Sequence, residues 1–393
     1  MKILIAPDSF KGSMTAAEVA ECICQGVKSV CPEAIVKKLA LSDGGEGLVD
    51  CLVEATGGDQ FVTKVTGPMG EPVEASWGIL GDQVTAVIEM ASASGLMLIQ
   101  DDKRDPRVAT TYGTGELISA AINRNCTNII LGLGGSATND GGSGMVQALG
   151  AKLLNKDGKN IDFGGNALRE LDRIDVSEID ERLKSIDFQV ACDVDNILTG
   201  ENGASHIFAP QKGATPSMVV DLDRALRHYA KIIKRDLNKD VEFMPGAGAA
   251  GGVGAGVVAF LEGSLTSGIE LVIKAVNLQD ELADCDLVIT GEGKLDEQSF
   301  HGKVPVGIAR LAKKFGVPVV VIAGNVYKET AYLHSEGVTA YFSIINEPMS
   351  LDVAMTKGKE LLEFTTNQLL RFYLSNSKFS RIRGNCKKPT STQ

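Results

Sequence analysis

The sequence predicts an α/β protein with two α/β domains. One domain is a doubly wound parallel sheet built from both chain ends, and the other is an inserted mixed α/β domain. Both chain ends alternate short apolar runs with amphipathic stretches of helical period, a pattern typical of parallel sheets. The middle of the chain contains alternating apolar and polar residues around a turn signal, which favours antiparallel strands. With 393 residues, 44% of them hydrophobic, the chain can bury two cores.

The first strand and helix follow from local signals. Residues 2–7, KILIAP, form a short apolar run that predicts a strand. Thr15 and Glu18 have the spacing of a capping box, in which a hydroxyl and a carboxylate satisfy free amides at a helix start. Apolar residues then recur at helical spacing, so we predict a helix up to residue 30.

The next elements repeat this order. Residues 34–41, AIVKKLAL, predict a second strand, and residues 46–58 predict a helix that Gly57 and Gly58 close. Between them lies LSDGGEG, where an aspartate stands among three glycines. One Asp-Gly pair usually marks a turn, but similar segments recur along this chain.

The C-terminal part of the chain shows the same alternation. Residues 286–290 predict a strand, residues 291–302 a loop, residues 304–316 a helix and residues 317–324 another strand. These elements complete the predicted parallel sheet.

The middle of the chain is more varied. Residues 70–90 alternate like antiparallel strands, with a turn at Gly81 and Asp82. Residues 215–236 predict a helix with Pro216 in its first turn, and residues 241–261 a glycine-rich loop that runs into a helix. Residues 128–142 have strand-then-loop form, and an alternative places this strand in the first sheet.

We therefore expect a discontinuous Rossmann-like domain of residues 1–62 plus 270–373 and an inserted mixed α/β domain of residues 63–269. Residues 374–393 contain five basic residues, no acidic residue and few apolar ones. This composition predicts a disordered basic tail.

Composition excludes several function classes. The net charge of −11 argues against nucleic acid or an anionic membrane surface as the main partner. No apolar run has the length of a membrane span, and the N-terminus lacks the apolar core of a signal peptide. The eight cysteines form no CxxC pair, which favours reduced thiols over a disulfide framework or a zinc site. We expect a cytoplasmic protein that acts on small molecules.

Four aspartates follow predicted strands. Asp8, Asp43, Asp193 and Asp296 each lie just beyond an apolar run, and parallel sheets bind ligands beyond the carboxyl ends of their strands. Any one of them can instead be a helix cap or turn residue. Because there are four, turn or cap roles for all of them are improbable, and we expect the four to converge on one cleft.

Two glycine-rich loops are candidate anion sites. Residues 132–144, GLGGSATNDGGSG, lie between a strand and a predicted helix, where unobstructed amides can bind an anion. Residues 245–256 match GxGxxG by count but lack a clean preceding strand, so helix packing explains them equally well. Walker A, protein-kinase and nucleophile-elbow motifs are absent.

Basic residues are sparse in the predicted loops. Lys11, Lys212, Lys294 and Lys303 are candidates to bind phosphate or carboxylate, with solvated surface lysines as the alternative. Arg104 and Arg107 have the same two interpretations, a carboxylate clamp or surface ion pairs. His301 alone among the four histidines lies in a motif-like loop.

Eight segments, in order along the chain, resemble the bacterial type I glycerate kinases: APDSFKGS, LSDGGEG, TYGTGELI, GLGGSATNDGG, ACDVDNILTGENGAS, FAPQKGA, PGAGAAGG and TGEGKLDEQSFHGKVP. The resemblance implies two α/β domains around a cleft and transfer of phosphate from ATP to D-glycerate with Mg²⁺. It further implies the 2-hydroxyl as acceptor and 2-phosphoglycerate as product. The basic tail extends beyond the usual end of this family.

Phosphoryl transfer needs carboxylates for the metal, amides or lysines for the phosphates, and a carboxylate near the acceptor hydroxyl. The candidate catalytic residues are Asp193, Asp43, Asp296 and Lys11, with Asp193 beside the acceptor hydroxyl and Asp43 and Asp296 as Mg²⁺ ligands. The candidate substrate- and nucleotide-binding residues are Asp8, Ser9, Lys11, Gly44, Gly45, Gly134, Gly135, Ser136, Asn139, Asp140, Lys212, Gly291, Glu292, Lys294 and His301.

Three alternatives stay open from the sequence: a glycerate 3-kinase, a non-catalytic nucleotide or metabolite sensor, and a dinucleotide-dependent reductase. A reductase requires a GxGxxG motif directly after a well-defined strand near a chain end. A sensor usually contains an added recognition module. The chain offers neither, unless the tail serves as the module. We expect a monomer or homodimer.

Overall fold

The computed structural model describes residues 1–45, 47–295, 303–327 and 332–383, with side chains described through residue 375. It divides into two compact units. Unit 1 contains residues 1–41 and 277–393, and unit 2 contains residues 42–276. The divisions predicted from the sequence lie after residues 62 and 269 instead. The first helix after residue 41 belongs to unit 2, where it packs against the strands of that unit's sheet.

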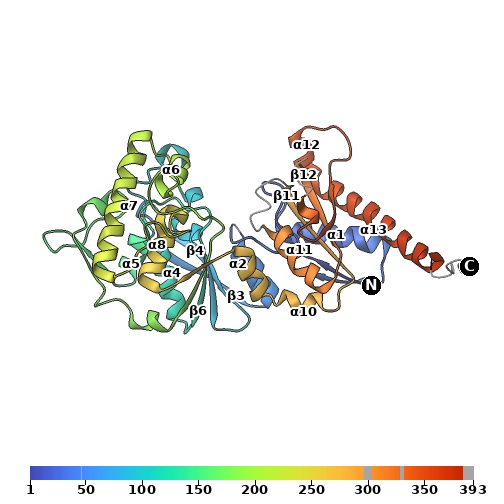
Figure 1. The fold of residues 1–393 in the computed structure, drawn as a ribbon, viewed down its shortest axis with the longest axis horizontal. Helices are drawn as coiled ribbons and strands as arrows, with labels where there is room; N and C mark the ends of the chain where they lie inside the picture. The colour runs from blue at the N-terminus through green and yellow to red at the C-terminus, as the bar shows by residue number, and fades with distance from the viewer. Residues whose placement is uncertain (46, 296–302, 328–331, 384–393) are drawn as a thin grey trace, which may run out of the picture. The chain divides into compact units, whose positions relative to one another are not determined.

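Unit 1 is built on a five-stranded sheet in the order β13-β12-β11-β1-β2, in which every neighbouring pair is parallel. Its elements are β1 (Lys2–Ile5), α1 (Ala16–Val30), β2 (Ile35–Lys38), α10 (Leu278–Leu282), β11 (Leu287–Leu295), α11 (Val304–Phe315), β12 (Val319–Val326), β13 (Val338–Ser343), α12 (Leu351–Thr356) and α13 (Gly358–Arg383). Figure 1 shows the first and last parts of the chain together in this unit. The predicted parallel sheet from both chain ends is confirmed.

Local signals in unit 1 behave as predicted. The Thr15 hydroxyl accepts a hydrogen bond from the N–H of Glu18, and the Glu18 carboxylate accepts one from the N–H of Thr15, so the capping box is present. Helix α1 packs against α13, which the sequence analysis did not predict, and a Cβ atom on Gly26 would lie 2.7 Å from Cβ of Thr366. Helix α13 continues through Arg383, into the segment that was expected to be disordered.

The prediction of a loop from residue 291 is wrong for its first part. Strand β11 continues through Leu295 and pairs with β12 as far as Leu295 and Val326. The glycines here permit close approach of neighbouring strands: a Cβ atom on Gly291 would lie 2.2 Å from the carbonyl oxygen of Ile322. Glycine in a strand can mark such an approach as well as a loop.

Unit 2 is built on a six-stranded mixed sheet in the order β10-β9-β6-β5-β4-β3. Its strands are β3 (Asp59–Thr66), β4 (Pro72–Ile79), β5 (Thr85–Glu89), β6 (Asn128–Gly132), β9 (Asp187–Ala191) and β10 (Ser264–Thr266), with a separate hairpin of β7 (Lys152–Leu154) and β8 (Arg173–Asp175). Strands β3, β4 and β5 are antiparallel, while β5, β6, β9 and β10 are mutually parallel. The predicted mixed inserted domain is confirmed, and β6 belongs to this sheet rather than to the first one.

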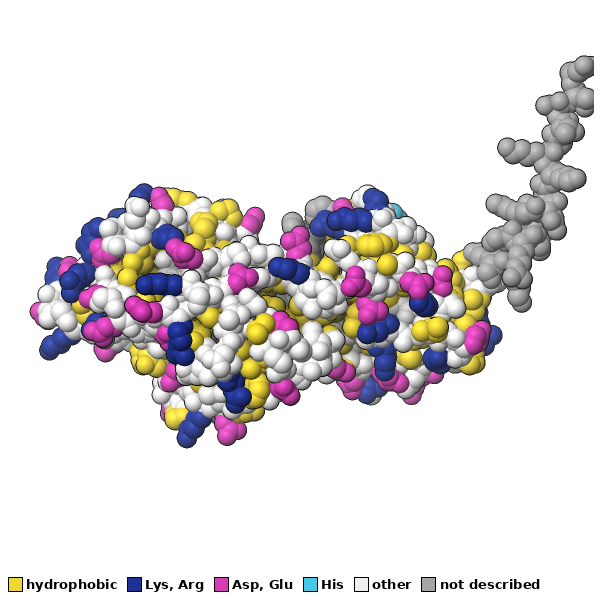
Figure 2. Space-filling view, turned by 90° about the horizontal axis from the view of Figure 1, so that it is seen from below, with side chains coloured by type: hydrophobic (Ala, Val, Ile, Leu, Met, Phe, Trp, Pro, Cys, Tyr) yellow, Lys and Arg dark blue, Asp and Glu magenta, His cyan; other side chains and the backbone are white. Residues whose placement is uncertain are grey.

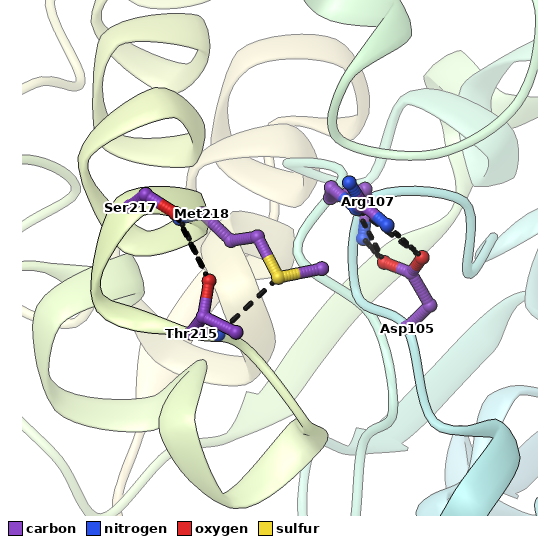
Figure 3. Close-up of polar contacts among 5 residues, drawn as sticks. All are labelled: Asp105, Arg107, Thr215, Ser217 and Met218. Carbon is purple, nitrogen blue, oxygen red and sulfur yellow. Dashed lines mark hydrogen bonds and ion pairs between the residues drawn. The ribbon is translucent and has the colours of Figure 1, made fainter.

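The helices of unit 2 are α2 (Leu48–Thr56), α3 (Ala91–Ser94), α4 (Tyr112–Ile122), α5 (Ser143–Ala148), α6 (Ala204–Phe208), α7 (Pro216–Leu237), α8 (Ala249–Leu261) and α9 (Gly268–Ala275), with 3₁₀ turns η1 (Leu96–Leu98), η2 (Asp101–Lys103), η3 (Ala167–Glu170), η4 (Glu181–Ser185) and η5 (Pro210–Lys212). Gly57 closes α2 in the left-handed conformation, as predicted. At the start of α7 the Thr215 hydroxyl accepts from the N–H of Met218, and the Met218 sulfur accepts from the N–H of Thr215 (Figure 3).

The glycines of residues 245–256 serve helix packing. A Cβ atom on Gly251 would lie 2.1 Å from the carbonyl oxygen of Thr138, and one on Gly256 would lie 2.6 Å from that of Gly141. Backbone approaches this short are open only to glycine. Of the two interpretations, the structure supports packing over a dinucleotide fingerprint.

Among the described residues, no helix combines the length and apolar character that crossing a membrane requires. On the face drawn in Figure 2, the described lysines and arginines are interspersed with aspartates and glutamates and form no continuous basic stripe.

Candidate active site

The carboxyl edge of the unit 2 sheet gathers most of the predicted site residues of that unit. Strands β5, β6, β9 and β10 run parallel, so their carboxyl ends meet at one edge. Glu89, the last residue of β5, accepts a 2.8 Å hydrogen bond from the N–H of Val49 and thereby ties the start of α2 to this edge. The loop that carries Asp43 immediately precedes α2.

The glycines of LSDGGEG allow the Asp43 loop to pack tightly on this edge. A Cβ atom on Gly44 would lie 2.7 Å from Cβ of Ala191, at the end of β9. One on Gly134 would lie 3.0 Å from Cα of Gly45. The backbones of neighbouring loops therefore meet where side chains would separate them, and the Asp43 carboxylate is held at the strand ends. Its Oδ1 accepts a 3.3 Å hydrogen bond from the N–H of Gly45.

Asp193 lies two residues beyond β9, at the same edge. Its Oδ1 accepts hydrogen bonds from the Ser267 hydroxyl at 2.9 Å and from the N–H of Gly268, the first residue of α9, at 3.0 Å. Desolvation raises the pKa of Asp193 to about 6, and the negative charges of Asp43 and Glu270 add to this shift. The residue is exposed, so a solute can reach its carboxylate.

A pKa near 6 suits a base that works at neutral pH. The carboxylate is ionised at pH 7 and yet holds a proton more readily than an ordinary aspartate. Two hydrogen bonds to one oxygen also fix the orientation of the side chain. Asp193 therefore combines a fixed orientation with a raised pKa, which keeps it a candidate general base.

The loop after β6 presents a row of backbone amides. Gly134 and Gly135 are exposed, and Gly135 has a positive φ of 71°. Within the described part of the chain, the N–H groups of Gly134, Gly135 and Ser136 donate to no protein acceptor. Successive amides around a left-handed residue form a concavity that binds anions.

Asn139 and Asp140, from the same loop, are fully buried. The Asp140 carboxylate accepts hydrogen bonds from the N–H and hydroxyl of Thr111 and from the N–H groups of Gly142 and Gly144. Burial raises its pKa, although these four donors oppose the shift. Asn139 donates to the Ser205 hydroxyl. Both side chains hold the loop against its neighbours.

Lys212 is also buried, with 2% of its surface exposed. Its Nζ donates to Ser136 Oγ at 2.8 Å and to the carbonyl oxygen of Thr138 at 2.7 Å. Burial lowers the pKa of Lys212 to about 7, and the negative charge of Asp140 opposes part of that shift. The sequence could not distinguish this buried lysine from a solvated one.

The carboxyl edge of the unit 1 sheet holds the remaining described candidates. Asp8 follows β1, and its Oδ1 accepts from the N–H of Ser9 at 2.6 Å. Lys11 is exposed in the same loop. Glu292 is buried within β11, after Gly291, and its Oε2 lies 3.4 Å from Nζ of Lys303.

Lys294 is exposed, and its Nζ lies 4.9 Å from the centre of the Tyr327 ring. Asp296 and His301 lie outside the described residues. The prediction that Asp8, Asp43, Asp193 and Asp296 share one cleft therefore stays a prediction.

The two arginines form local ion pairs. Arg107 binds Asp105 through two guanidinium nitrogens (Figure 3), and Arg104 lies 2.6 Å from Asp101. The sequence left open whether these arginines clamp a carboxylate of a ligand or form surface ion pairs, and the structure shows ion pairs.

Ser267, Gly268 and Glu89 were not predicted as site residues. A serine followed by glycine before an apolar stretch signals a helix start at residue 268, but β10 is only three residues long and gave no strand signal. Glu89 is the last residue of an apolar strand, and the sequence rule that selected the four aspartates would have found it if applied to glutamates.

A magnesium ion fits the carboxylates of unit 2. Within the described residues, no group of three or more His, Cys, Asp or Glu side chains could hold a metal ion by itself. Mg²⁺ is usually bound by one or two carboxylates together with substrate phosphates and water. Asp43 and Asp193 interact electrostatically, and the amides of residues 134–136 belong to the neighbouring loop. This donor set suits a metal that arrives with a phosphate.

The profile of the glycerate kinase family matches residues 3–374, nearly the whole described chain. The chain belongs to the glycerate kinase family. This confirms the resemblance that the eight sequence segments indicated.

Similar proteins support the same assignment. Glycerate 2-kinase of Escherichia coli (strain K12) is 54% identical over 354 residues, which cover 90% of this chain and 93% of the relative. Glycerate kinase of Halalkalibacterium halodurans is 50% identical over 361 residues, which cover 92% of this chain and 95% of the relative. The chain also resembles the crystal structure of a candidate glycerate kinase 2 from Salmonella typhimurium LT2, with a TM-score of 0.86 and 48% sequence identity. The superposition covers 96% of this chain and 99% of the Salmonella chain.

Proposed function

We propose that the protein is an ATP-dependent kinase that phosphorylates D-glycerate at the 2-hydroxyl, with 2-phosphoglycerate and ADP as products. The observation that carries this proposal is the family match over residues 3–374, with a relative named glycerate 2-kinase at 54% identity. The strand-end carboxylates of unit 2 and the amides of residues 134–136, which have no acceptor among the described residues, are groups that phosphoryl transfer needs.

In the proposed reaction, the 2-hydroxyl oxygen attacks the γ-phosphorus of ATP, and the bond from that phosphorus to the bridging oxygen of ADP breaks. Asp193 accepts the proton that the hydroxyl loses. Its hydrogen bonds from Ser267 and Gly268 hold one carboxylate oxygen, which leaves the other to face the acceptor. The amides of residues 134–136 bind phosphoryl oxygens, and Lys11 is proposed to act from the loop after β1.

Asp43 and Asp296 are the proposed ligands of Mg²⁺. The bound ion would neutralise negative charge on the phosphates as the transfer proceeds. Asp8, Ser9, Gly44, Gly45, Gly291, Glu292, Lys294 and His301 complete the proposed binding residues. Asn139, Asp140 and Lys212 are buried, so we propose that they support the site from beneath.

The decisive assay incubates the protein with ATP, Mg²⁺ and D-glycerate, follows ADP, and resolves 2-phosphoglycerate from 3-phosphoglycerate by chromatography. We expect ADP and 2-phosphoglycerate to form in equal amounts. Formation of 3-phosphoglycerate would indicate a glycerate 3-kinase. ATP binding without turnover of any hydroxy acid would favour a nucleotide sensor.

We also propose a cytoplasmic location and a monomer or homodimer, with ATP and glycerate as partners and no nucleic acid or membrane. Every described cysteine is a free thiol, which suits a reducing compartment. Size-exclusion chromatography with light scattering would determine the oligomeric state.

A further inference from the structure

The buried ammonium of Lys212 lies directly beneath the amide row of residues 134–136. Its Nζ donates to the side chain of Ser136, the third residue of that row, and to the carbonyl oxygen of Thr138 two residues later. Only 2% of Lys212 is exposed, so a ligand on the exposed face of Gly134 and Gly135 does not contact it.

The other end of the loop is held by the buried carboxyl group of Asp140. Asp140 accepts hydrogen bonds from Gly142 and Gly144 at the start of α5 and from Thr111 at the start of α4. A buried charge is tolerated where hydrogen bonds or an opposite charge compensate it, and the two charges interact favourably. The loop is thus fixed at both ends by side chains that take no part in its exposed surface.

Through its hydrogen bonds to Ser136 and Thr138, Lys212 can influence the conformation of residues 134–136. The N–H groups of Gly134, Gly135 and Ser136 have no acceptor among the described residues, and Gly134 packs against Gly45 in the loop that carries Asp43. Amides that converge on an anion must keep their directions, because hydrogen bonds weaken steeply with misalignment. The bond from Lys212 to Ser136 sets the direction of the last residue of the row.

We propose that Lys212 is a positioning residue for the nucleotide: it holds residues 134–136 in the conformation that binds phosphoryl oxygens of ATP, and it acts through Ser136 and Thr138 without contacting the ligand. This inference rests on the proposed kinase function for the identity of the anion. It assigns the amide row to the phosphates of ATP rather than to the carboxylate of glycerate, because Asp43, in the loop that packs against Gly134, is suited to share a metal with phosphate.

The test compares Lys212→Met with the wild type and with Lys234→Met, an exposed lysine of α7 that pairs with Asp240. Steady-state kinetics give kcat and the KM values for ATP and for D-glycerate, and calorimetry gives the Kd of MgATP. We expect Lys212→Met to weaken MgATP binding by about tenfold or more, with KM for D-glycerate within about twofold of wild type. A merely structural lysine would lower the amount of folded enzyme, hence the apparent kcat, without changing the Kd of the folded fraction.

An unchanged MgATP Kd in folded Lys212→Met would overturn the proposal, as would a rise in KM for D-glycerate alone, which would assign the amide row to the acceptor carboxylate. If Lys212→Met does not fold, Ser136→Ala removes only the bond between the lysine and the row, and we expect it to weaken MgATP binding by about threefold or more. A wild-type Kd in Ser136→Ala would then overturn the proposal. Because calorimetry needs no turnover, a wild-type protein that binds MgATP but does not phosphorylate glycerate would refute the proposed function and leave this test valid.

Discussion

Gly268 lies against the backbone of Asp43 so closely that a Cβ atom on Gly268 would stand 1.8 Å from the carbonyl oxygen of Asp43. The N–H of the same glycine donates to the carboxylate of Asp193. One residue without a side chain therefore sets the positions of the two aspartates that we assign to the metal and to the acceptor hydroxyl.

Gly268→Ala should consequently reduce activity strongly. The added methyl group must displace the Asp43 loop or the start of α9, and misplacement of a catalytic group by about 1 Å can lower the rate about 10²-fold. We expect kcat/KM to fall by about that factor. The control is Gly158→Ala, a glycine with positive φ and no atom within 4 Å of its Cβ position. Equal activity of the two variants would contradict this account.

Asp193→Asn tests the assignment of the base. The asparagine retains an oxygen that can accept from Ser267 and Gly268, but it loses the charge and cannot take a proton. We expect kcat to fall by about 10²–10⁴ with little change in ATP affinity. Near-normal turnover in the folded variant would transfer the role to Asp43 or Asp296. Loss of ATP binding would instead make Asp193 a metal ligand.

The rate should also depend on the ionisation of Asp193. Burial and the charges of Asp43 and Glu270 raise its pKa to about 6, while the donors Ser267 and Gly268 oppose the shift. As pH falls through about 6 the base becomes protonated, so we expect kcat/KM to decline with a slope of one. The residual activity of Asp193→Asn should lack this acid limb. An acid limb that persists in this variant would point to another group.

The same shift has a defined sign for stability. The folded pKa lies above the unfolded value of about 3.9, so between about pH 4 and 6 the folded state binds more protons at Asp193 than the unfolded state does. The stabilising contribution of this proton is fully present below about pH 4 and is lost as pH rises through 6. In the wild type, this group should make the free energy of unfolding decline as pH rises from about 4 to 6. In Asp193→Asn that part of the decline should be absent.

Asp43→Asn tests the magnesium assignment. The amide oxygen can still accept from the N–H of Gly45, but the neutral side chain is a poorer ligand for Mg²⁺. We expect the Mg²⁺ concentration for half-maximal rate to rise about tenfold or more. Asp50→Asn, on the exposed face of α2, is the matched control. An unchanged magnesium dependence in Asp43→Asn would remove Asp43 from the metal site.

Asp140→Ala should destabilise unit 2. It leaves two N–H groups at the start of α5 and both donors of Thr111 without a partner, and each buried unsatisfied group costs about 1–3 kcal/mol. We expect the free energy of unfolding to fall by at least about 3 kcal/mol. The chain has one tryptophan, Trp77, and it is buried in unit 2, so its fluorescence reports this unit. Asp157→Ala, in an exposed turn, should unfold like the wild type.

Much of the fold follows from the sequence because its signals are local. The capping box of Thr15 and Glu18, the left-handed closure at Gly57 and the first-turn Pro216 each depend on hydrogen bonds within a few residues. The alternation of apolar runs with helical stretches likewise predicted the parallel sheet from both chain ends. Asp193 at the end of a strand was placed by the same reasoning.

The tertiary structure decided what depends on contacts between distant segments. Residues 128–132 form a strand whose apolar pattern suits either sheet, and only pairing with β5 and β9 assigns it to unit 2. Residues 291–295 resemble a loop in sequence, but the neighbouring strand β12 extends β11 across their glycines. The sequence around Lys212 does not distinguish it from a solvated surface lysine. Only the packing of η5 against the loop after β6 buries its side-chain nitrogen. Periodicity reports which face of an element is buried, and the partner on that face is chosen by packing across the whole unit.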